Sequence, residues 1–135
     1  MKKIVALIGI FLLSISCSVD DNSPKLHYEL LKIDSVELPT DFIINEENDI
    51  QINFIRPSNC YGFDGFYYEK NEFTRTVAVQ GIVFDRDNCT PLSNPISSQT
   101  LHFTPTVSGT YTFKFWKGKD ANNVDIFEEI SIVVP

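Results

Sequence analysis

Histidine is scarce in this chain, because its 135 residues include only His27 and His102. Proton transfer and nucleophile activation near neutral pH most often rely on histidine beside a serine, a cysteine or a carboxylate. His27 lies in or beside a polar N-terminal stretch. His102 stands between Leu101 and Phe103, where a strand would turn it to the opposite face. No Ser/His/Asp or Cys/His set can be assembled from two such positions, and we expect a protein without enzymatic activity.

Carboxylates are plentiful but poorly arranged for joint chemistry. Glu128 and Glu129 are adjacent, and neighbours on a strand point to opposite faces. Carboxylates from separate strands can still meet, as in glycosidases, so a carboxylate-based hydrolase is a third alternative. The run from Asp120 to Asp125 offers oxygen atoms for calcium, but Val124 occupies a ligand position and the EF-hand glycine is missing. Asp and Asn favour turns, and we expect no metal and no cofactor.

Basic residues are also few. Lys and Arg number 11 against 18 Asp and Glu, and without Lys2 and Lys3 nine basic side chains face those 18, a net charge of −9. Nucleic-acid binding requires clustered Lys and Arg, so this composition excludes a nucleic-acid partner. The acidic balance favours solubility and by itself names no other partner.

Only one extended apolar run is present, and it opens the chain. Lys2 and Lys3 precede it, it spans residues 4–13, and the small-residue segment Ser14-Ile15-Ser16 follows. A charged start, a short apolar stretch and a small-residue cleavage zone are typical of an export signal. The run is shorter than the ~20 apolar residues that a membrane-spanning helix needs. We therefore expect residues 1–16 to be a signal peptide.

The segment Leu13-Ser14-Ile15-Ser16-Cys17 resembles the lipobox of bacterial lipoproteins, in which a small residue precedes a cysteine that becomes acylated. Ser14 departs from the usual leucine, but looser forms are common in lipoproteins of the Bacteroidetes type. The resemblance implies an exported protein whose acylated Cys17 inserts into the lipid bilayer of the outer membrane, on its periplasmic or cell-surface face. Each buried CH₂ of an acyl chain contributes ~0.8 kcal/mol to that anchoring. An ordinary secretory signal with an incidental cysteine is the alternative.

Residues 17–27 form a polar tether in this interpretation. Asp20 and Asp21 make it acidic, which resembles the surface-export signal of Bacteroidetes lipoproteins and equally fits a solvated spacer. Fully extended, residues 18–27 reach ~35 Å at most, so the domain would stay near its membrane. Residues 28–135 are then enough for one domain.

Two cysteines remain in this expected domain, Cys60 and Cys89. In an oxidising compartment such a pair most often forms a disulfide. Closing a loop of ~30 residues contributes about 3–4 kcal/mol in the chain-entropy view. A metal-binding or catalytic thiol is the alternative, but neither cysteine has a histidine nearby in sequence or belongs to a C-x-x-C motif.

Alternation of apolar and polar residues dominates residues 28–135, and no segment has the period of an amphipathic helix. Ile50, Ile52 and Phe54, for example, share one face of a strand. The predicted strands are 28–38, 49–56, 66–69, 73–85, 100–104, 110–116 and 124–134. About seven strands separated by short turns predict an all-β fold, a single antiparallel β-sandwich.

The segment Val107-Ser108-Gly109-Thr110-Tyr111-Thr112-Phe113 resembles the G-x-Y-x-C segment entering strand F of immunoglobulin-like domains, with Phe113 in place of the cysteine. The resemblance implies an immunoglobulin-like sandwich. It also implies that Tyr111 is a corner tyrosine, with a packed ring and a hydroxyl bonded to nearby backbone. Cys60 and Cys89 do not have the spacing of the usual inter-sheet disulfide.

Six aromatic residues lie close together: Tyr61, Phe63, Phe66, Tyr67, Tyr68 and Phe73. Strand alternation cannot bury all of them on one face, so some are expected to be exposed in an end loop over residues 61–73. Exposed rings beside polar groups are typical of surfaces that bind sugars or proteins. The candidate ligand-binding residues are therefore Tyr61, Phe63, Tyr67, Tyr68 and, on the strand face opposite Tyr111, Trp116. The alternative is that these rings close one end of the core.

These observations favour a membrane-anchored binding or interaction module for a glycan or an envelope protein, using loops 61–73 and 117–123. A structural accessory subunit that docks through edge strands in a cell-envelope complex is the alternative. Separately, Asp34-Ser35-Val36 resembles the three-residue O-glycosylation acceptor of exported Bacteroidetes proteins, which makes Ser35 a candidate modification site.

Overall fold

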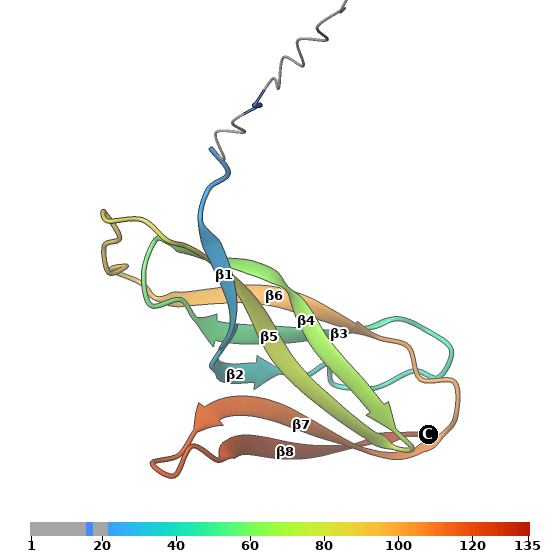
Figure 1. Cartoon of the computed structure of the whole chain (residues 1–135). Coiled ribbons are helices and arrows are strands. Elements are labelled where there is room, and N and C mark those ends of the chain that lie inside the picture. The colour runs from blue at the N-terminus through green and yellow to red at the C-terminus, as the bar shows by residue number, and fades with distance from the viewer. Residues whose placement is uncertain (1–15, 18–21) are drawn as a thin grey trace, which may run out of the picture.

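The computed structural model describes residues 16–17 and 22–135, and the fold is all-β: two sheets pack around one core (Figure 1). The described part forms eight strands: β1 (Leu26–Leu31), β2 (Ile33–Glu37), β3 (Asn48–Ile55), β4 (Tyr61–Asn71), β5 (Thr74–Phe84), β6 (Ile96–Phe103), β7 (Gly109–Lys119) and β8 (Asp125–Val134). The expected signal peptide lies outside the described residues, apart from Ser16. Within the described ranges, no helix is long and apolar enough to cross a membrane.

The larger sheet contains five strands, and β5 is its central element. β4 and β5 form a long antiparallel hairpin. The other edge of β5 is shared, because β1 pairs with its second half from Val79 to Phe84 and β7 pairs with its first half from Thr74 to Val77. β8 then pairs with β7. The smaller sheet has the strand order β2-β3-β6.

One pairing departs from the antiparallel arrangement that the sequence predicts, because β5 and β7 are parallel. Between them the chain crosses to the smaller sheet, runs along β6 and crosses back. Each crossing reverses the chain direction, so β7 enters the larger sheet in the direction of β5 (Figure 1). The two-layer sandwich is confirmed, and the crossover is a feature that the strand pattern alone did not indicate.

β1 and β2 come from one predicted strand, 28–38, which changes sheets at Lys32. Leu31, at the end of β1, is 2% exposed and packs over Gly81 of β5. A Cβ atom added at Gly81 would lie 2.7 Å from Cγ of Leu31. Gly81 is therefore needed for this close approach, which accounts for a glycine in the middle of a long strand.

The core fills the space between the inner faces of the two sheets. Its fully buried side chains come from both layers and include Phe54, Val77, Val79, Phe113 and Phe115. Tyr111 is 2% exposed, and its hydroxyl donates a hydrogen bond to the carbonyl oxygen of Val107 at 2.7 Å. The predicted packed ring and backbone-bonded hydroxyl of Tyr111 are thus confirmed.

The predicted disulfide between Cys60 and Cys89 is also confirmed, with the two Cα atoms 5.6 Å apart. It joins the loop before β4 to the loop after β5. The same loops exchange two further hydrogen bonds, from the Asn59 N–H to the Thr90 carbonyl at 3.1 Å and from the Thr90 N–H to Oδ1 of Asn59 at 2.9 Å. The cross-link closes 29 positions of chain, which contributes about 3–4 kcal/mol to the free energy of unfolding.

Candidate functional site

Residues 61–71 form strand β4 rather than the end loop expected from the sequence. The strand contains a β-bulge between Phe63 and Gly65, whose partners on β5 are consecutive, so Asp64 is the extra residue. Gly65 has a φ of +146°, a conformation that glycine adopts freely and other residues rarely do. The glycine-rich composition of this segment therefore builds a bulged strand instead of a loop.

The bulge shifts the alternation of β4 by one position and turns most of its rings inward. The rings that pack against the core are Tyr61, Phe63, Phe66 and Tyr68. Phe63, for instance, lies with its ring centroid 5.7 Å from that of Phe54 and 5.0 Å from that of Phe66. The expectation that the six rings could not all share one face holds, because Tyr67 and Phe73 are 42% and 41% exposed, but the bulge turns more rings inward than uninterrupted alternation would allow. Tyr61, Phe63 and Tyr68 therefore face the core side of the sheet.

The second predicted loop, 117–123, is also shorter than expected, because β7 continues to Lys119. The turn that follows is closed by Asp120. Its Oδ1 accepts hydrogen bonds from the N–H groups of Asn122 at 2.8 Å and Val124 at 3.0 Å. This acidic run is thus organised as a turn around its own first carboxylate.

Two of the candidate ligand-binding residues meet on the outer face of the larger sheet. Tyr67 points outward from β4 and is 42% exposed, and Trp116 lies on the outer face of β7. Between them lies a groove of about 340 Å³, which we call the outer groove. All five strands of the sheet contribute to its lining, which consists of Leu30, Tyr67, Glu69, Thr76, Ala78, Trp116, Asp125 and Phe127.

Side-chain size across the strands explains why the sheet is hollowed here. The central strand β5 presents only Thr76 and Ala78 on this face, whereas its neighbours present large rings and Leu30. A row of small residues between larger ones leaves a depression on a pleated surface. The outer groove is therefore a product of the pairing of β5 with three other strands.

Trp116 forms a fixed wall of the groove. Its side chain is 7% exposed, and its Nε1–H donates to Oδ1 of Asp125 at 2.9 Å. Nζ of Lys119 lies 3.0 Å from the same oxygen. The hydrogen bond from Trp116, and then the one from Lys119, hold the pKa of Asp125 below its ordinary value. Asp125 therefore presents an ionised carboxylate at the groove.

Tyr67 supplies the opposite wall, and its hydroxyl donates a hydrogen bond to Oε2 of Glu69, which lies on the same face of β4. This bond raises the pKa of Tyr67, so the phenol stays neutral and Glu69 acts as an acceptor. The groove thus combines apolar rings with two carboxylates and the hydroxyl of Thr76. None of its described lining residues is a cation.

Sequence reasoning missed Leu30, Ala78 and Phe127 as groove residues. Each is an apolar residue out of phase with the buried stripe of its own strand. Ala78, for example, stands between the fully buried Val77 and Val79. An apolar residue on the expected solvent face of a strand is the signal that could have indicated this surface.

Both histidines lie on the surface beside carboxylates. Nδ1 of His102 lies 2.8 Å from Asp49 and 3.1 Å from Glu47. These three exposed side chains are, in the described part of the chain, the group whose ligand atoms lie close enough to hold a metal ion. Within this group, Nδ1 of His102 forms a hydrogen bond with Oδ1 of Asp49.

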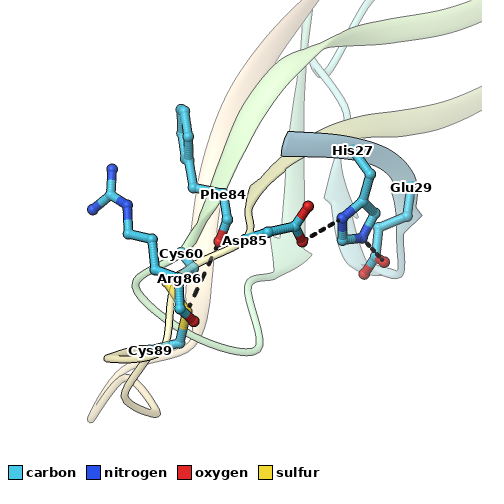
Figure 2. A network of polar contacts seen from close by, with 7 residues as sticks. All are labelled: His27, Glu29, Cys60, Phe84, Asp85, Arg86 and Cys89. Carbon is cyan, nitrogen blue, oxygen red and sulfur yellow. Dashed lines mark hydrogen bonds and ion pairs between the residues drawn. A yellow bond between two sulfur atoms is a disulfide. The ribbon is translucent and has the colours of Figure 1, made fainter. Parts of the chain in front are cut away.

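His27 belongs to β1 rather than to the tether, because the strand begins at Leu26. Its Nδ1 lies 2.8 Å from Oδ1 of Asp85, and its Nε2 lies 3.1 Å from Oε2 of Glu29. Figure 2 shows the ring held between these carboxylates, near the Cys60–Cys89 disulfide. The bond to Glu29 and then the bond to Asp85 raise the pKa of His27.

Two further candidate positions are accessible. Ser35 is exposed on β2, and its Oγ accepts a hydrogen bond from Nδ2 of Asn53 at 3.0 Å. Cys17 is exposed and forms no disulfide. Modification of Ser35 and acylation of Cys17 both stay predictions of the sequence.

No family model, no curated protein and no solved structure shows significant similarity to this chain. The fold and the site are therefore interpreted from the residues themselves.

Proposed function

We propose that this chain is a lipid-anchored, exported binding module whose outer groove binds an uncharged glycan. The observation that carries the proposal is the meeting of Tyr67, Trp116 and Phe127 with Glu69 and Asp125 in one groove. A pyranose ring offers an apolar face of C–H groups and a rim of hydroxyl groups. Aromatic rings match the first, and ionised carboxylates accept hydrogen bonds from the second.

Charge decides between neutral and acidic sugars. Glu69 and Asp125 line the groove itself, whereas two cations stand at its margin: Lys119 pairs with Asp125, and Lys114 lies over the ring of Phe127. The carboxylate of a sugar acid would be repelled by Glu69 and Asp125 in the lining. The groove therefore favours a neutral or N-acetylated sugar.

Attachment to a membrane rests on the sequence pattern around Cys17. Support comes from its exposure and its lack of a disulfide partner, since the other two cysteines pair with each other. β1 begins nine positions after Cys17, and eight intervening residues span ~28 Å at most when extended. The sandwich would thus present its groove within a short distance of the bilayer.

An immunoglobulin-like variant is the fold type that we propose for the sandwich. The hydrogen bond from Tyr111 to the backbone four residues upstream supports it, because that contact defines a tyrosine corner. The parallel pairing of β5 with β7 would be this chain's own variation.

The test is a titration with soluble neutral oligosaccharides of glucose, mannose, galactose, xylose and N-acetylglucosamine. Trp116 is the only tryptophan in the sequence, so its fluorescence reports directly on the groove. Calorimetry gives the affinity independently. We expect saturable binding of at least one neutral sugar and none of its uronic acid counterpart.

A matched pair of variants locates the site. Thr76→Arg places a long side chain in the groove, whereas Thr112→Arg makes the same change on the neighbouring strand, outside the lining. We expect Thr76→Arg to abolish binding and Thr112→Arg to leave it unchanged. Equal effects of the two variants, or silence with every sugar, would overturn the proposal.

A protein partner is the second candidate, as in the accessory-subunit alternative. The observation that favours it is an exposed apolar row on β1, where Leu26, Tyr28 and Leu30 are 36%, 63% and 42% exposed. Such a row is more apolar than a strand face in water needs to be. If sugars fail, loss of a co-purifying protein on Tyr28→Ser would favour this function.

A further inference from the structure

Arg75 occupies an unusual position for a cation, at the inner face of β5 where the sandwich opens between its sheets. It is 9% exposed. Nη1 donates to the carbonyl oxygens of Glu72 at 2.6 Å and Thr74 at 3.0 Å, and the guanidinium lies 5.0 Å from the ring centroid of Tyr111. Nε is buried and has no hydrogen-bond partner.

No carboxylate compensates this charge. Within residues 16–17 and 22–135, neither Arg75 nor its cross-strand partner Lys70 forms an ion pair, although the chain has 18 acidic residues. Buried arginines are normally paired with a carboxylate, because an uncompensated buried charge lowers the free energy of unfolding by roughly several kcal/mol. Arg75 thus has carbonyl oxygens and an aromatic ring as partners but, among the described residues, no carboxylate within ion-pair distance.

A pocket lies directly against these cations. It has a volume of about 230 Å³, and its lining consists of Tyr68, Lys70, Arg75, His102, Phe103 and Thr104. The residues come from the β4–β5 hairpin in the larger sheet and from the end of β6 in the smaller one. Hydroxyl, ammonium and guanidinium donors dominate this lining, in contrast to the outer groove.

Aromatic rings lie beside both cations. Nζ of Lys70 lies 6.0 Å from the ring centroid of Tyr68, a cation–π distance, and Tyr68 also neighbours Arg75. Phe103 packs at a ring distance of 5.2 Å on the same Tyr111 ring that Arg75 covers. The buried Arg75 and the exposed Lys70 therefore line the same space.

We propose that this pocket binds an oxyanion, the carboxylate, sulfate or phosphate group of a small ligand. A planar guanidinium beside an ammonium matches the geometry and charge of such a group, and hydroxyls of Tyr68 and Thr104 add neutral donors. Glu47 and Asp49 lie beside His102 at the rim of the pocket, where they repel anions. Only a ligand that extends past them to Arg75 and Lys70 can therefore bind. The site is separate from the outer groove and does not depend on the proposed glycan function.

The test follows the Nε–H group of Arg75 by ¹H–¹⁵N NMR. The chain has only three arginines, Arg56, Arg75 and Arg86, so Lys substitutions of the other two assign the signal. Sodium acetate, sulfate and phosphate are titrated separately, each against sodium chloride at the same ionic strength. We expect a saturable shift of the Arg75 signal with at least one oxyanion and no shift with chloride.

Lys70→Ala and Lys25→Ala form the matched pair, because both remove one lysine from the surface and only Lys70 lines the pocket. We expect Lys70→Ala to weaken oxyanion binding about tenfold or more, the loss of one charge-assisted hydrogen bond, and Lys25→Ala to change it little. The anion that binds most tightly identifies the ligand class. An unmoved Arg75 signal, equal shifts with chloride, or equal weakening by both variants would overturn the proposal.

Discussion

The outer faces of the two sheets have opposite chemistry. On the smaller sheet, polar side chains sit directly across from one another on β3 and β6, as Gln51 does with Thr100 and Asp49 with His102. Oγ1 of Thr100 donates to Oε1 of Gln51 at 3.1 Å. At the centre of this face, Nδ2 of Asn53 donates to Ser35 and Glu37 on β2.

The outer face of the larger sheet instead carries apolar side chains in the same kind of position. Tyr28 is 63% exposed and Tyr67 is 42% exposed, and Trp116 and Phe127 line the groove beside them. A face whose polar groups satisfy one another has little to offer a ligand, whereas a hollowed apolar face gains free energy when it is covered. This difference is the reason why we propose that the larger sheet carries the ligand surface.

Deleting Asp64 and Gly65 together is the most drastic way to break this contrast. Phe63 and Phe66 then become neighbours on β4, so either Tyr61 and Phe63 or Phe66 and Tyr68 must leave the inner face. Exposing two rings costs about 3–6 kcal/mol of the free energy of unfolding. Urea denaturation measures it, and deletion of Asp64 alone is the control, because it removes the extra residue and leaves Phe63 and Phe66 two positions apart on one face. A double deletion as stable as the single one would show that this spacing does not set the faces.

A pair of neighbouring tyrosines compares the two faces of one strand. Tyr67→Ala removes an outer wall of the groove and should weaken glycan binding about tenfold while leaving the thermal midpoint nearly unchanged. Tyr68→Ala removes a half-buried inner ring and should cost about 1–2 kcal/mol of stability while glycan affinity is kept. Calorimetry and denaturant titration read the two effects. The reverse pattern would place the ligand on the other side of β4.

The polar face of the smaller sheet should respond only in stability. Asn53→Ala removes the hydrogen bonds to Ser35, Glu37 and Ser98 from a partly exposed network, and we expect a loss of about 1 kcal/mol. Ser98→Ala, which removes only one of these bonds, should cost less. Urea denaturation of both variants checks the order. A change in glycan affinity in either one would contradict the assignment of binding to the larger sheet.

The smallest expected effect concerns His27. This residue lies on the side of β1 opposite the exposed apolar row of Leu26, Tyr28 and Leu30. Because folding raises the pKa of His27 above its ordinary 6.5, its stabilising contribution is full below that pH and is lost as the pH rises through the folded value. The thermal midpoint of His27→Gln should therefore fall below that of the parent at pH 5.5 and approach it at pH 8.5. Glu29→Gln, which removes the largest cause of the shift, should behave in the same direction. A midpoint difference independent of pH would contradict this account.

Several features were predictable because they depend on neighbouring residues or on a count. Alternation around Ile50, Ile52 and Phe54 predicted a half-buried strand, and all three are at most 1% exposed. The disulfide between Cys60 and Cys89 was predictable because, with Cys17 assigned to the lipid, each of these cysteines had only the other as a partner. The contacts of Tyr111 followed from a short motif, since its hydroxyl reaches only four residues back.

The candidate site was predictable only in part. Tyr67 and Trp116 were expected to bind a ligand and do line the outer groove, but Tyr61, Phe63 and Tyr68 face the core side. Sequence could not separate them, because the bulge that reverses the alternation depends on how β4 pairs with β5. The pocket at Arg75 was not predicted either, because it forms only where the two sheets meet.

The sequence by itself determined the strand content, the disulfide and the tyrosine contact, because each follows from local periodicity, composition or a short motif. The tertiary structure decided the parallel pairing of β5 with β7, the direction in which each aromatic ring of β4 points, and the two hollows at Trp116 and Arg75. Those features require residues far apart in the chain to be paired in a particular register. A shift of one residue in that register exchanges the buried and exposed faces of a strand.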